Sequence, residues 1–199
     1  MIERALISVS NKSGLDGLVE ELRRWDVEII ASSGTASRIR ALGYGNVKEV
    51  SEYTGHPESP SGLLKTLHPK IHGGLLLDRE DPEHREYMEQ HGIRPLDLVV
   101  VNLYPFEDTV KRGASLGEAV ENIDIGGPTM MRAAAKAALL YGRVAVVVDP
   151  VQYGEVVEAL GENEGSIPSS LRRRLVEEAF RRTAGYDAAI LSYLERREE

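Results

Sequence analysis

The sequence predicts an α/β fold built on a doubly wound, mainly parallel sheet. Short apolar runs of strand length alternate with segments that carry apolar residues at helical spacing, which indicates repeated strand–helix units. Two of the runs, Leu98–Leu103 and Val144–Val148, are almost wholly apolar and therefore indicate strands buried on both faces. Turns of small polar residues follow several runs, at the end of a parallel sheet where ligands bind.

The expected elements follow in chain order. Strands are predicted at residues 5–9, 27–31, 47–50, 98–103 and 144–148. Helices are predicted at 15–25, from the Ser32–Thr35 turn to about 42, and at 82–91, 115–122, 128–136, 151–160 and 169–194. In the last of them, the apolar stripe is expected to begin with Leu171, Leu175, Ala179 and Phe180.

Glycines and prolines interrupt residues 53–74, which are predicted to be irregular. A loop this long in a compact domain is usually functional. At 199 residues the chain is expected to form a single domain, 1–199, with a helical extension at about 168–194.

Composition narrows the classes of function. A formal charge of −8 argues against general nucleic-acid binding, which needs a basic stripe. Without an apolar run of transmembrane length or a signal peptide, no membrane partner is expected. The absence of Cys excludes disulfides and fits a cytoplasmic protein. The cations gather near glycine and serine loops, which favours a small anionic ligand.

The stretch from Glu121 to Lys136 combines a carboxylate, Asp124, with a glycine pair and a helix expected to begin at Pro128. Free N–H groups and the positive dipole end of such a helix suit an anion. Thr129, Arg132 and Lys136 share one face. A solvated basic face explains the two cations as well as a ligand does, although the neighbouring alanines favour a buried setting.

The other polar segments also allow two interpretations. Ser32-Ser33-Gly34-Thr35 suits a phosphate or is a plain helix N-cap, and Ser10, Asn11 and Lys12 at the preceding strand end favour the phosphate. No Walker or dinucleotide motif is present, so ATP and NAD are not indicated.

Single residues are less decisive. Lys65 is solvated by default, Tyr104 anchors its ring or acts chemically, and Asp124 caps a helix or takes part in catalysis. His68 and His72 lack a zinc pattern, so structural roles are expected for them, with no metal and no cofactor.

Six segments together resemble the inosine-monophosphate cyclohydrolase domain of the bifunctional purine-biosynthesis enzyme family. They are Ser8-Val9-Ser10-Asn11-Lys12-Ser13-Gly14, Ser32-Ser33-Gly34-Thr35-Ala36, Lys65-Thr66-Leu67-His68-Pro69, Asn102-Leu103-Tyr104-Pro105-Phe106, Ile123-Asp124-Ile125-Gly126-Gly127 and Arg132-Ala133-Ala134-Ala135-Lys136. Thr183-Ala184-Gly185-Tyr186-Asp187 extends the likeness over nearly the whole chain. The resemblance implies a methylglyoxal-synthase-like fold and a dehydrative ring closure that gives inosine monophosphate, classed among the hydrolases.

The resemblance also implies roles for residues. Its catalytic residues correspond to Lys65, Tyr104, Asp124 and Lys136. Lys136 would handle a proton that Asp124 positions, while Lys65 and Tyr104 face the developing oxyanion. Contacts with a purine nucleotide are implied for Ser10, Asn11, Lys12, Ser32, Ser33, Gly34, Thr35, Thr66, Asn102, Ile125 and Gly126. By the same analogy a homodimer is expected.

The chain departs from the family at Ala137, where relatives carry Asn, and at Leu63, where they often carry Arg and where an anion contact is weakened. The transformylase part of the family is not matched, so no formyl transfer from a folate donor is expected. Two alternatives stay open: a methylglyoxal synthase, and a nucleotide-sensing regulatory domain without catalysis. The sensor would need the phosphate loops but not Lys65, Tyr104, Asp124 and Lys136 together.

Overall fold

The structure is a computed structural model that describes residues 1–196, with Ser61 described by its backbone alone. Positions 197–199 of the predicted domain lie outside the described residues. In the described chain a single sheet runs in the order β3-β2-β1-β4-β5. Every pairing is parallel. The strands are β1 (Arg4–Val9), β2 (Glu28–Ala31), β3 (Val47–Glu49), β4 (Leu98–Asn102) and β5 (Ala145–Val147). The predicted α/β class and parallel sheet are confirmed.

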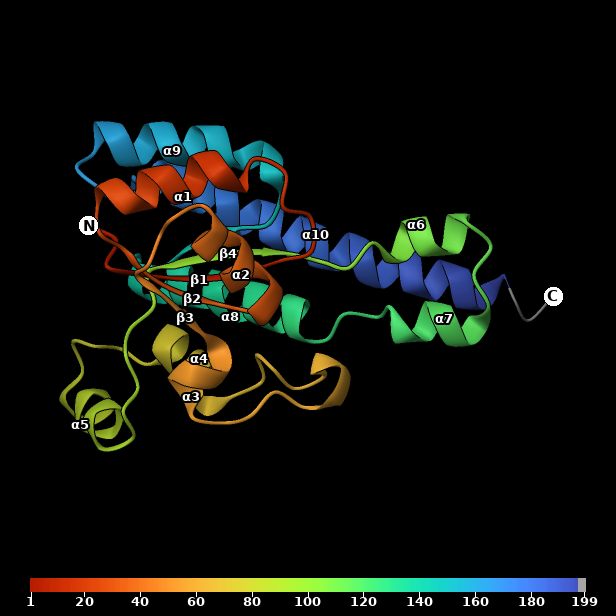
Figure 1. Ribbon diagram of the computed structural model, residues 1–199, viewed down its shortest axis with the longest axis horizontal. Helices are drawn as coiled ribbons and strands as arrows, with labels where there is room; N and C mark the ends of the chain where they lie inside the picture. The colour runs from red at the N-terminus through yellow and green to blue at the C-terminus, as the bar shows by residue number, and fades with distance from the viewer. Residues whose placement is uncertain (197–199) are drawn as a thin grey trace.

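Helices cover both faces of the sheet (Figure 1). Alternating strand residues divide the core in two: Ala5 and Ile7 face one side, and Leu6 faces the other. The first side is covered by α1 (Leu15–Arg24), α2 (Ser33–Ala41) and α9 (Tyr153–Glu162). The second is covered by α3 (Val50–Thr54), α4 (Pro69–Leu76) and α8 (Gly126–Tyr141). This two-sided cover buries the first four residues of β4, Leu98 to Val101, on both faces.

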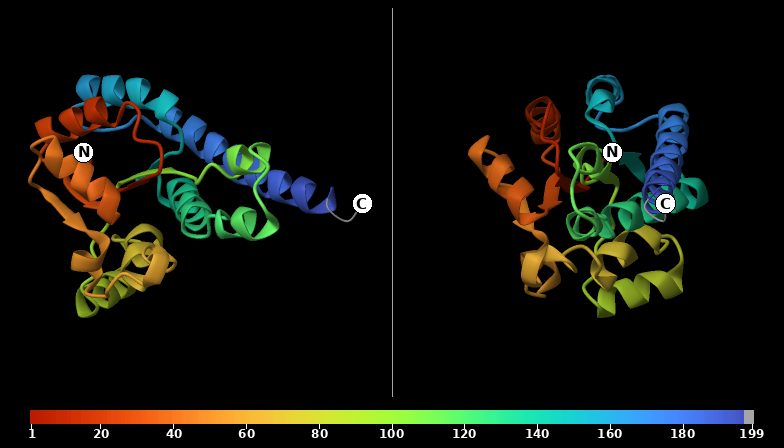
Figure 2. Two further views of the ribbon diagram at one scale, coloured as in Figure 1. Left: turned by 45° about the vertical axis from the view of Figure 1, so that its right-hand side comes forward. Right: turned by 90° about the vertical axis from the view of Figure 1, so that its right-hand side faces the viewer.

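The long helix α10 (Ser169–Glu195) contributes to both halves of the core. Leu171 and Leu175 near its start belong to the first cluster, and Val176, Ala179 and Tyr186 belong to the second. Beyond the sheet it runs alongside α6 (Phe106–Lys111) and α7 (Leu116–Glu121), and the three form a projecting arm (Figures 1 and 2). The helix therefore connects the sheet to the segments that follow β4.

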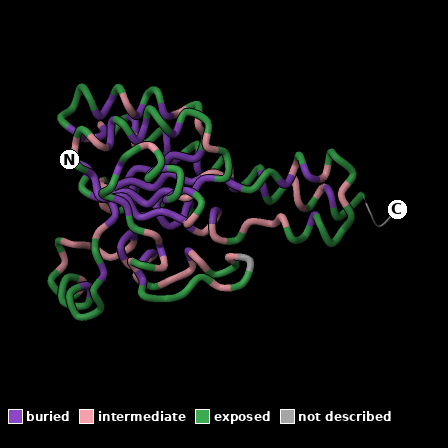
Figure 3. Tube along the Cα trace, viewed as in Figure 1, coloured by how far each residue is buried: buried purple, intermediate pink, exposed green. Residues whose placement is uncertain are grey.

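Short elements complete the described chain, namely η1 (Pro60–Gly62), α5 (Pro82–Gln90) and η2 (Pro150–Gln152). Burial is greatest in the strands and mixed in the projecting arm (Figure 3). No helix in the described part of the chain combines the length and apolar character that crossing a membrane requires.

Several expected boundaries are wrong. Residues 53–74 are not irregular throughout, because α3 ends at Thr54 and α4 begins at Pro69. Helix α8 begins at Gly126, two residues before Pro128, and no helix is predicted where α6 lies. Phe180 was expected on the buried stripe of the last helix. In the structure it is exposed to solvent, whereas its neighbour Ala179 is buried.

The glycines of α4 allow close packing and do not break the helix. A Cβ at Gly74 would lie 2.6 Å from the carbonyl oxygen of Arg94 and 3.2 Å from the side chain of Leu96. The N–H of Leu96 donates to the Gly74 oxygen at 2.9 Å, so helix and segment are fixed together. The glycines that suggested an irregular segment are therefore needed for the close contact between α4 and the Arg94–Leu96 segment.

We expect Gly74→Ala to lower the free energy of unfolding by roughly 1–3 kcal/mol, because the added methyl group meets backbone that cannot move aside cheaply. Denaturant unfolding measures the change. Gly17→Ala is the matched control: it lies in α1 with no atom within 4 Å of its Cβ position. That substitution is expected to stabilise the helix by up to about 1 kcal/mol. A Gly74→Ala variant as stable as the parent would contradict this account of α4.

Candidate active site

One side chain joins the ends of two neighbouring strands. Asn102, the last residue of β4, accepts hydrogen bonds from the N–H groups of Ser10 at 2.7 Å and Asn11 at 2.9 Å. Its amide also donates to the Asn11 oxygen at 2.8 Å. The chain leaves β1 for β2 on one side, while β4 lies on the other side of β1. Asn102 therefore sits at the switch point of the sheet, where parallel sheets bind ligands.

The end of β2 adds a second set of polar groups. Thr35, almost fully buried, accepts from the Val9 N–H at 3.3 Å, and Ser32 donates to the Thr35 hydroxyl at 3.2 Å. Ser32 is the N-cap residue of α2 without a side-chain capping bond, so the capping interpretation of this turn is incomplete. Gly34 is exposed, with open space where a Cβ would lie. The helix N-terminus thus opens toward the strand ends, as an anion site requires.

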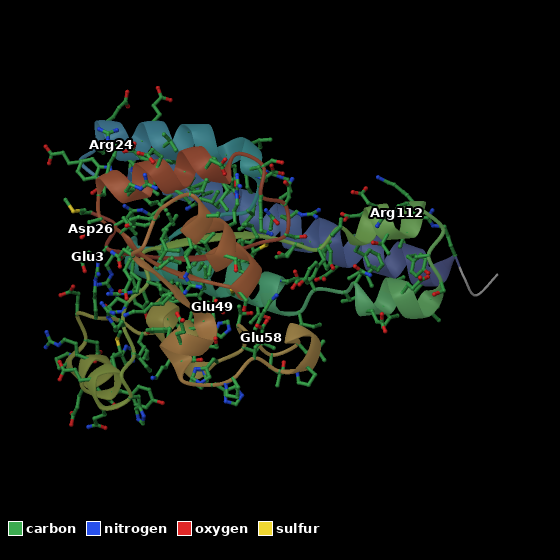
Figure 4. The ribbon with its side chains drawn as sticks, in the orientation of Figure 1. Glu3, Arg24, Asp26, Glu49, Glu58 and Arg112 are labelled. Carbon is green, nitrogen blue, oxygen red and sulfur yellow. The ribbon has the colours of Figure 1, made fainter. Side chains whose placement is uncertain are left out.

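A carboxylate already faces this helix end. Glu58 lies on the segment between α3 and η1, where Figure 4 labels it. Its carboxylate accepts a hydrogen bond from the Ser33 hydroxyl at 2.7 Å. Lys12 bonds back to its own strand, donating to the Val9 oxygen at 3.4 Å. An anionic ligand at the start of α2 would displace Glu58, because the ligand and the Glu58 carboxylate would be neighbouring negative charges that repel each other.

Three of the four predicted catalytic residues are connected by hydrogen bonds. Lys65 donates to the Tyr104 hydroxyl at 3.2 Å, and the Tyr104 N–H donates to Asp124 Oδ2 at 3.3 Å. The other oxygen of Asp124 accepts from the Gly127 N–H at 2.7 Å, which caps α8. These residues come from three separate segments, so the fold assembles the group. The capping role expected for Asp124 is real, and it fixes where the carboxylate points.

The loop before α4 packs on the start of α8. Thr66, 2% exposed, lies so close to Gly126 that a Cβ there would be 2.4 Å from its hydroxyl oxygen. Ile125 is exposed beside this contact. Leu63 is 72% exposed and does not line the pocket described below. Gly126 is thus needed for the two loops to approach.

A small pocket lies between the start of α2 and the segment that carries Lys65. Its lining includes Ser33, His56, Glu58, Lys65 and His68. His68 Nδ1 accepts from the Lys70 N–H at 3.1 Å and caps α4, which confirms a structural role. Burial, and then the neighbouring His56 and Lys70, lower the pKa of His68. The pocket therefore brings the Lys65 cation close to hydrogen-bonding groups at the start of α2.

His72 lies inside α4, not in a loop, and burial lowers its pKa. A neutral imidazole there fits a packing role. Among the described residues no group of three or more His, Asp or Glu side chains is arranged to hold a metal ion.

The structure does not bring Lys136 to Asp124. Lys136 lies ten residues beyond Gly126 along α8, which places it roughly 15 Å along the helix axis from the site. It is exposed, as are Arg132 on the same face and Leu139 and Leu140 one turn further. Within one chain a lysine side chain cannot span this gap.

Two buried tyrosines support the site, and sequence reasoning assigned them no role. Tyr153 of α9 hydrogen-bonds with Asn102, and burial raises its pKa to about 12. Tyr186 of α10 contacts the backbone of the Asp124 loop. Both tyrosines lie on helices in which the spacing of apolar residues indicates ordinary core packing. Tyr186 belongs to the Thr183–Asp187 segment that resembles the cyclohydrolase family, but the resemblance implied no role for it.

Two family models and several curated proteins are similar to this chain. A family model described as the MGS-like domain matches residues 14–129, and one described as the AICARFT/IMPCHase bienzyme matches residues 134–199. The bifunctional purine biosynthesis protein PurH of Bradyrhizobium diazoefficiens is 51% identical over 198 residues, covering 100% of this chain and 37% of that protein. PurH of Chelativorans sp. is 51% identical over 189 residues, 95% of this chain and 34% of that protein.

The chain thus spans about a third of the length of these curated relatives. A solved structure, that of ForH, superposes with a TM-score of 0.78 at 30% identity, covering 97% of this chain and 98% of the other. The MGS-like model alone takes in more than half of the 199 residues. The fold, the strand-end polar groups and these matches lead to one conclusion: the chain belongs to the MGS-like domain family.

Proposed function

We propose that the chain is an IMP cyclohydrolase, which closes the second purine ring by dehydrating 5-formamidoimidazole-4-carboxamide ribonucleotide to inosine monophosphate. The observation that carries the proposal is the hydrogen-bonded group of Lys65, Tyr104 and Asp124 beside the polar strand ends. The match to the AICARFT/IMPCHase family and to PurH proteins supports the reaction and the substrate class.

The phosphate of the nucleotide would bind where β1 and β2 end. The free N–H groups at the start of α2, the hydroxyls of Ser10 and Ser32, and the ammonium of Lys12 suit an anion. Glu58 would leave Ser33 when the phosphate enters. Asn102 would support this pocket indirectly, since it holds the backbone of Ser10 and Asn11 in place.

The base would then lie toward Lys65, Tyr104 and Asp124. In the reaction the carboxamide nitrogen attacks the formyl carbon and loses one proton. The formyl oxygen takes up that proton and the proton of the formamido nitrogen and leaves as water, while a C=N bond forms between the formamido nitrogen and the formyl carbon. Holding both groups in one molecule at attack distance supplies much of the rate. Lys65 and Tyr104 carry donors 3.2 Å apart that suit the developing oxyanion, while Asp124 orients and polarises the attacking amide.

The fourth catalytic residue calls for a second chain. We propose a homodimer in which Lys136 of one chain serves the site of its partner, where it handles a proton. The roughly 15 Å between Lys136 and the start of its own helix supports this arrangement. Leu139 and Leu140, both more than half exposed on the next turn, offer apolar surface for such a contact.

The test is the ultraviolet absorbance change that follows mixing of the purified chain with the formylated ribonucleotide. We expect catalytic turnover that persists after exhaustive chelation, because no bound metal or organic cofactor is part of the proposal. Nucleotide binding without turnover would favour a regulatory domain instead, and formation of methylglyoxal from a triose phosphate would favour a synthase. Activity restored only by added zinc or magnesium would refute the metal-free mechanism.

A further inference from the structure

The Asp124 loop is held from behind by a residue of the last helix. Tyr186 is 1% exposed, and its hydroxyl accepts a hydrogen bond from the Asp124 N–H at 2.8 Å. The same hydroxyl donates to the Asn122 oxygen at 3.1 Å. One side chain thus satisfies two backbone groups on either side of Ile123, from 62 residues further along the chain.

The ring of Tyr186 is itself fixed in place. Its edge meets Phe106, with ring centroids 6.0 Å apart and planes at 69°. The Arg182 guanidinium lies 5.8 Å from the ring centroid and pairs with Glu107 at 3.0 Å. Because Phe106 follows Tyr104 by two residues, this packing joins α10 to the segment of Tyr104 as well as to the loop of Asp124.

The state of the hydroxyl suits this role. Burial raises the pKa of Tyr186, so the group stays protonated at neutral pH and can donate to the Asn122 oxygen. Its accepted bond comes from the residue whose carboxylate reaches Tyr104 and Gly127. A small rotation of the backbone at Asp124 would move its two carboxylate oxygens away from the N–H groups of Tyr104 and Gly127.

We propose that Tyr186 is a positioning residue, which acts through the backbone of Asp124 and Asn122 to hold the Asp124 carboxylate in the orientation that ring closure needs. It does not touch the substrate. Catalysis therefore depends on α10, which lies outside the strand ends that bind the ligand. The proposal rests on the proposed cyclohydrolase function for its kinetic part, and on the loop geometry alone for the rest.

Tyr186→Phe removes the hydroxyl and leaves the ring on Phe106. We expect faster amide hydrogen exchange in the peptide that contains residues 122–127, by about tenfold or more, since a buried bond to the loop is lost. We also expect kcat to fall about tenfold to a hundredfold with little change in KM, because the loss acts on transition-state geometry.

Tyr44→Phe is the matched control. Tyr44 is also buried and donates to a backbone oxygen, that of Val27 at 2.7 Å, at the opposite end of the sheet. It should lower stability by a similar amount while loop exchange and kcat stay at parent values. Equal effects of the two substitutions on the 122–127 peptide and on kcat would overturn the proposal.

Arg182→Met provides a second variant at a position that is partly exposed. It removes the guanidinium beside the Tyr186 ring and should raise exchange of the same peptide to a smaller degree. Unchanged exchange in both variants would refute positioning. Exchange is measured without substrate, so faster exchange in a chain that lacks cyclohydrolase activity would fault the proposed function and leave the positioning role standing.

Discussion

Asp124→Asn is expected to lower the maximal rate of ring closure by about a hundredfold to a thousandfold, the usual loss when a preorganised charge is removed from a reacting site. Asn is as good as Asp at a helix N-terminus, so the bond to the Gly127 N–H and the start of α8 should survive. The substitution therefore separates the charge of Asp124 from its capping role. Steady-state kinetics with the formylated ribonucleotide measure the loss.

Asp124→Ala supplies the comparison. It removes both charge and cap, so the free energy of unfolding should fall by about 0.5–2 kcal/mol in addition to the kinetic loss. If Asp124→Asn turned over at the parental rate while Asp124→Ala was merely less stable, capping alone would explain this residue. That result would remove the carboxylate from the mechanism and leave Lys65 and Tyr104 to act without it.

The sheet could be predicted from the sequence because strands buried on both faces leave a strong local signal. The run of apolar residues at Leu98–Val101 has no polar face, and only a central strand of a covered parallel sheet tolerates this. A related rule predicts that a ligand binds at the carboxyl ends of these strands, and this part stays a prediction. Local patterns are sufficient where burial is uniform.

Helix α4 was missed for the opposite reason. Gly73 and Gly74 lower helix propensity, and contact explains them: a Cβ at Gly73 would meet Ile93, and a Cβ at Gly74 would meet Arg94 and Leu96. Such a contact joins residues about twenty positions apart and leaves no periodic signal. In α4, tertiary packing therefore outweighs the low helix propensity of the two glycines.

The supporting tyrosines were missed in a similar way. Tyr186 reaches a loop 62 residues earlier, and its apolar neighbours on α10 give it the pattern of a core residue. The distance of Lys136 from Asp124 could be calculated from the sequence, because Lys136 lies within the helix that begins next to Asp124 and the rise per residue of a helix is known. Sharing a helix with a loop does not place a side chain beside that loop.

Lys136→Ala is expected to reduce the maximal rate by about a hundredfold to ten-thousandfold, or roughly 3 to 5 kcal/mol of barrier, if the lysine handles a proton. Nucleotide affinity should change little, because the phosphate is held at Lys12 and the start of α2. Lys12→Ala should show the reverse, with weaker binding and a smaller loss of rate. Near-normal turnover of a folded Lys136→Ala variant would mean that this helix face is simply solvated.

Mixing two inactive variants tests whether Lys136 acts across a dimer. When Lys136→Ala and Asp124→Asn chains are unfolded, mixed equally and refolded, half of the dimers should pair one chain of each kind. Each mixed dimer would hold one site with an intact Asp124 and an intact partner lysine, because a two-fold interface places the same contacts at both sites. About a quarter of the parental activity should return. If both residues act within one chain, no mixed site is intact and activity stays at the level of the separate variants. Light scattering that gives a monomer mass for the fully active parent would also exclude the exchange.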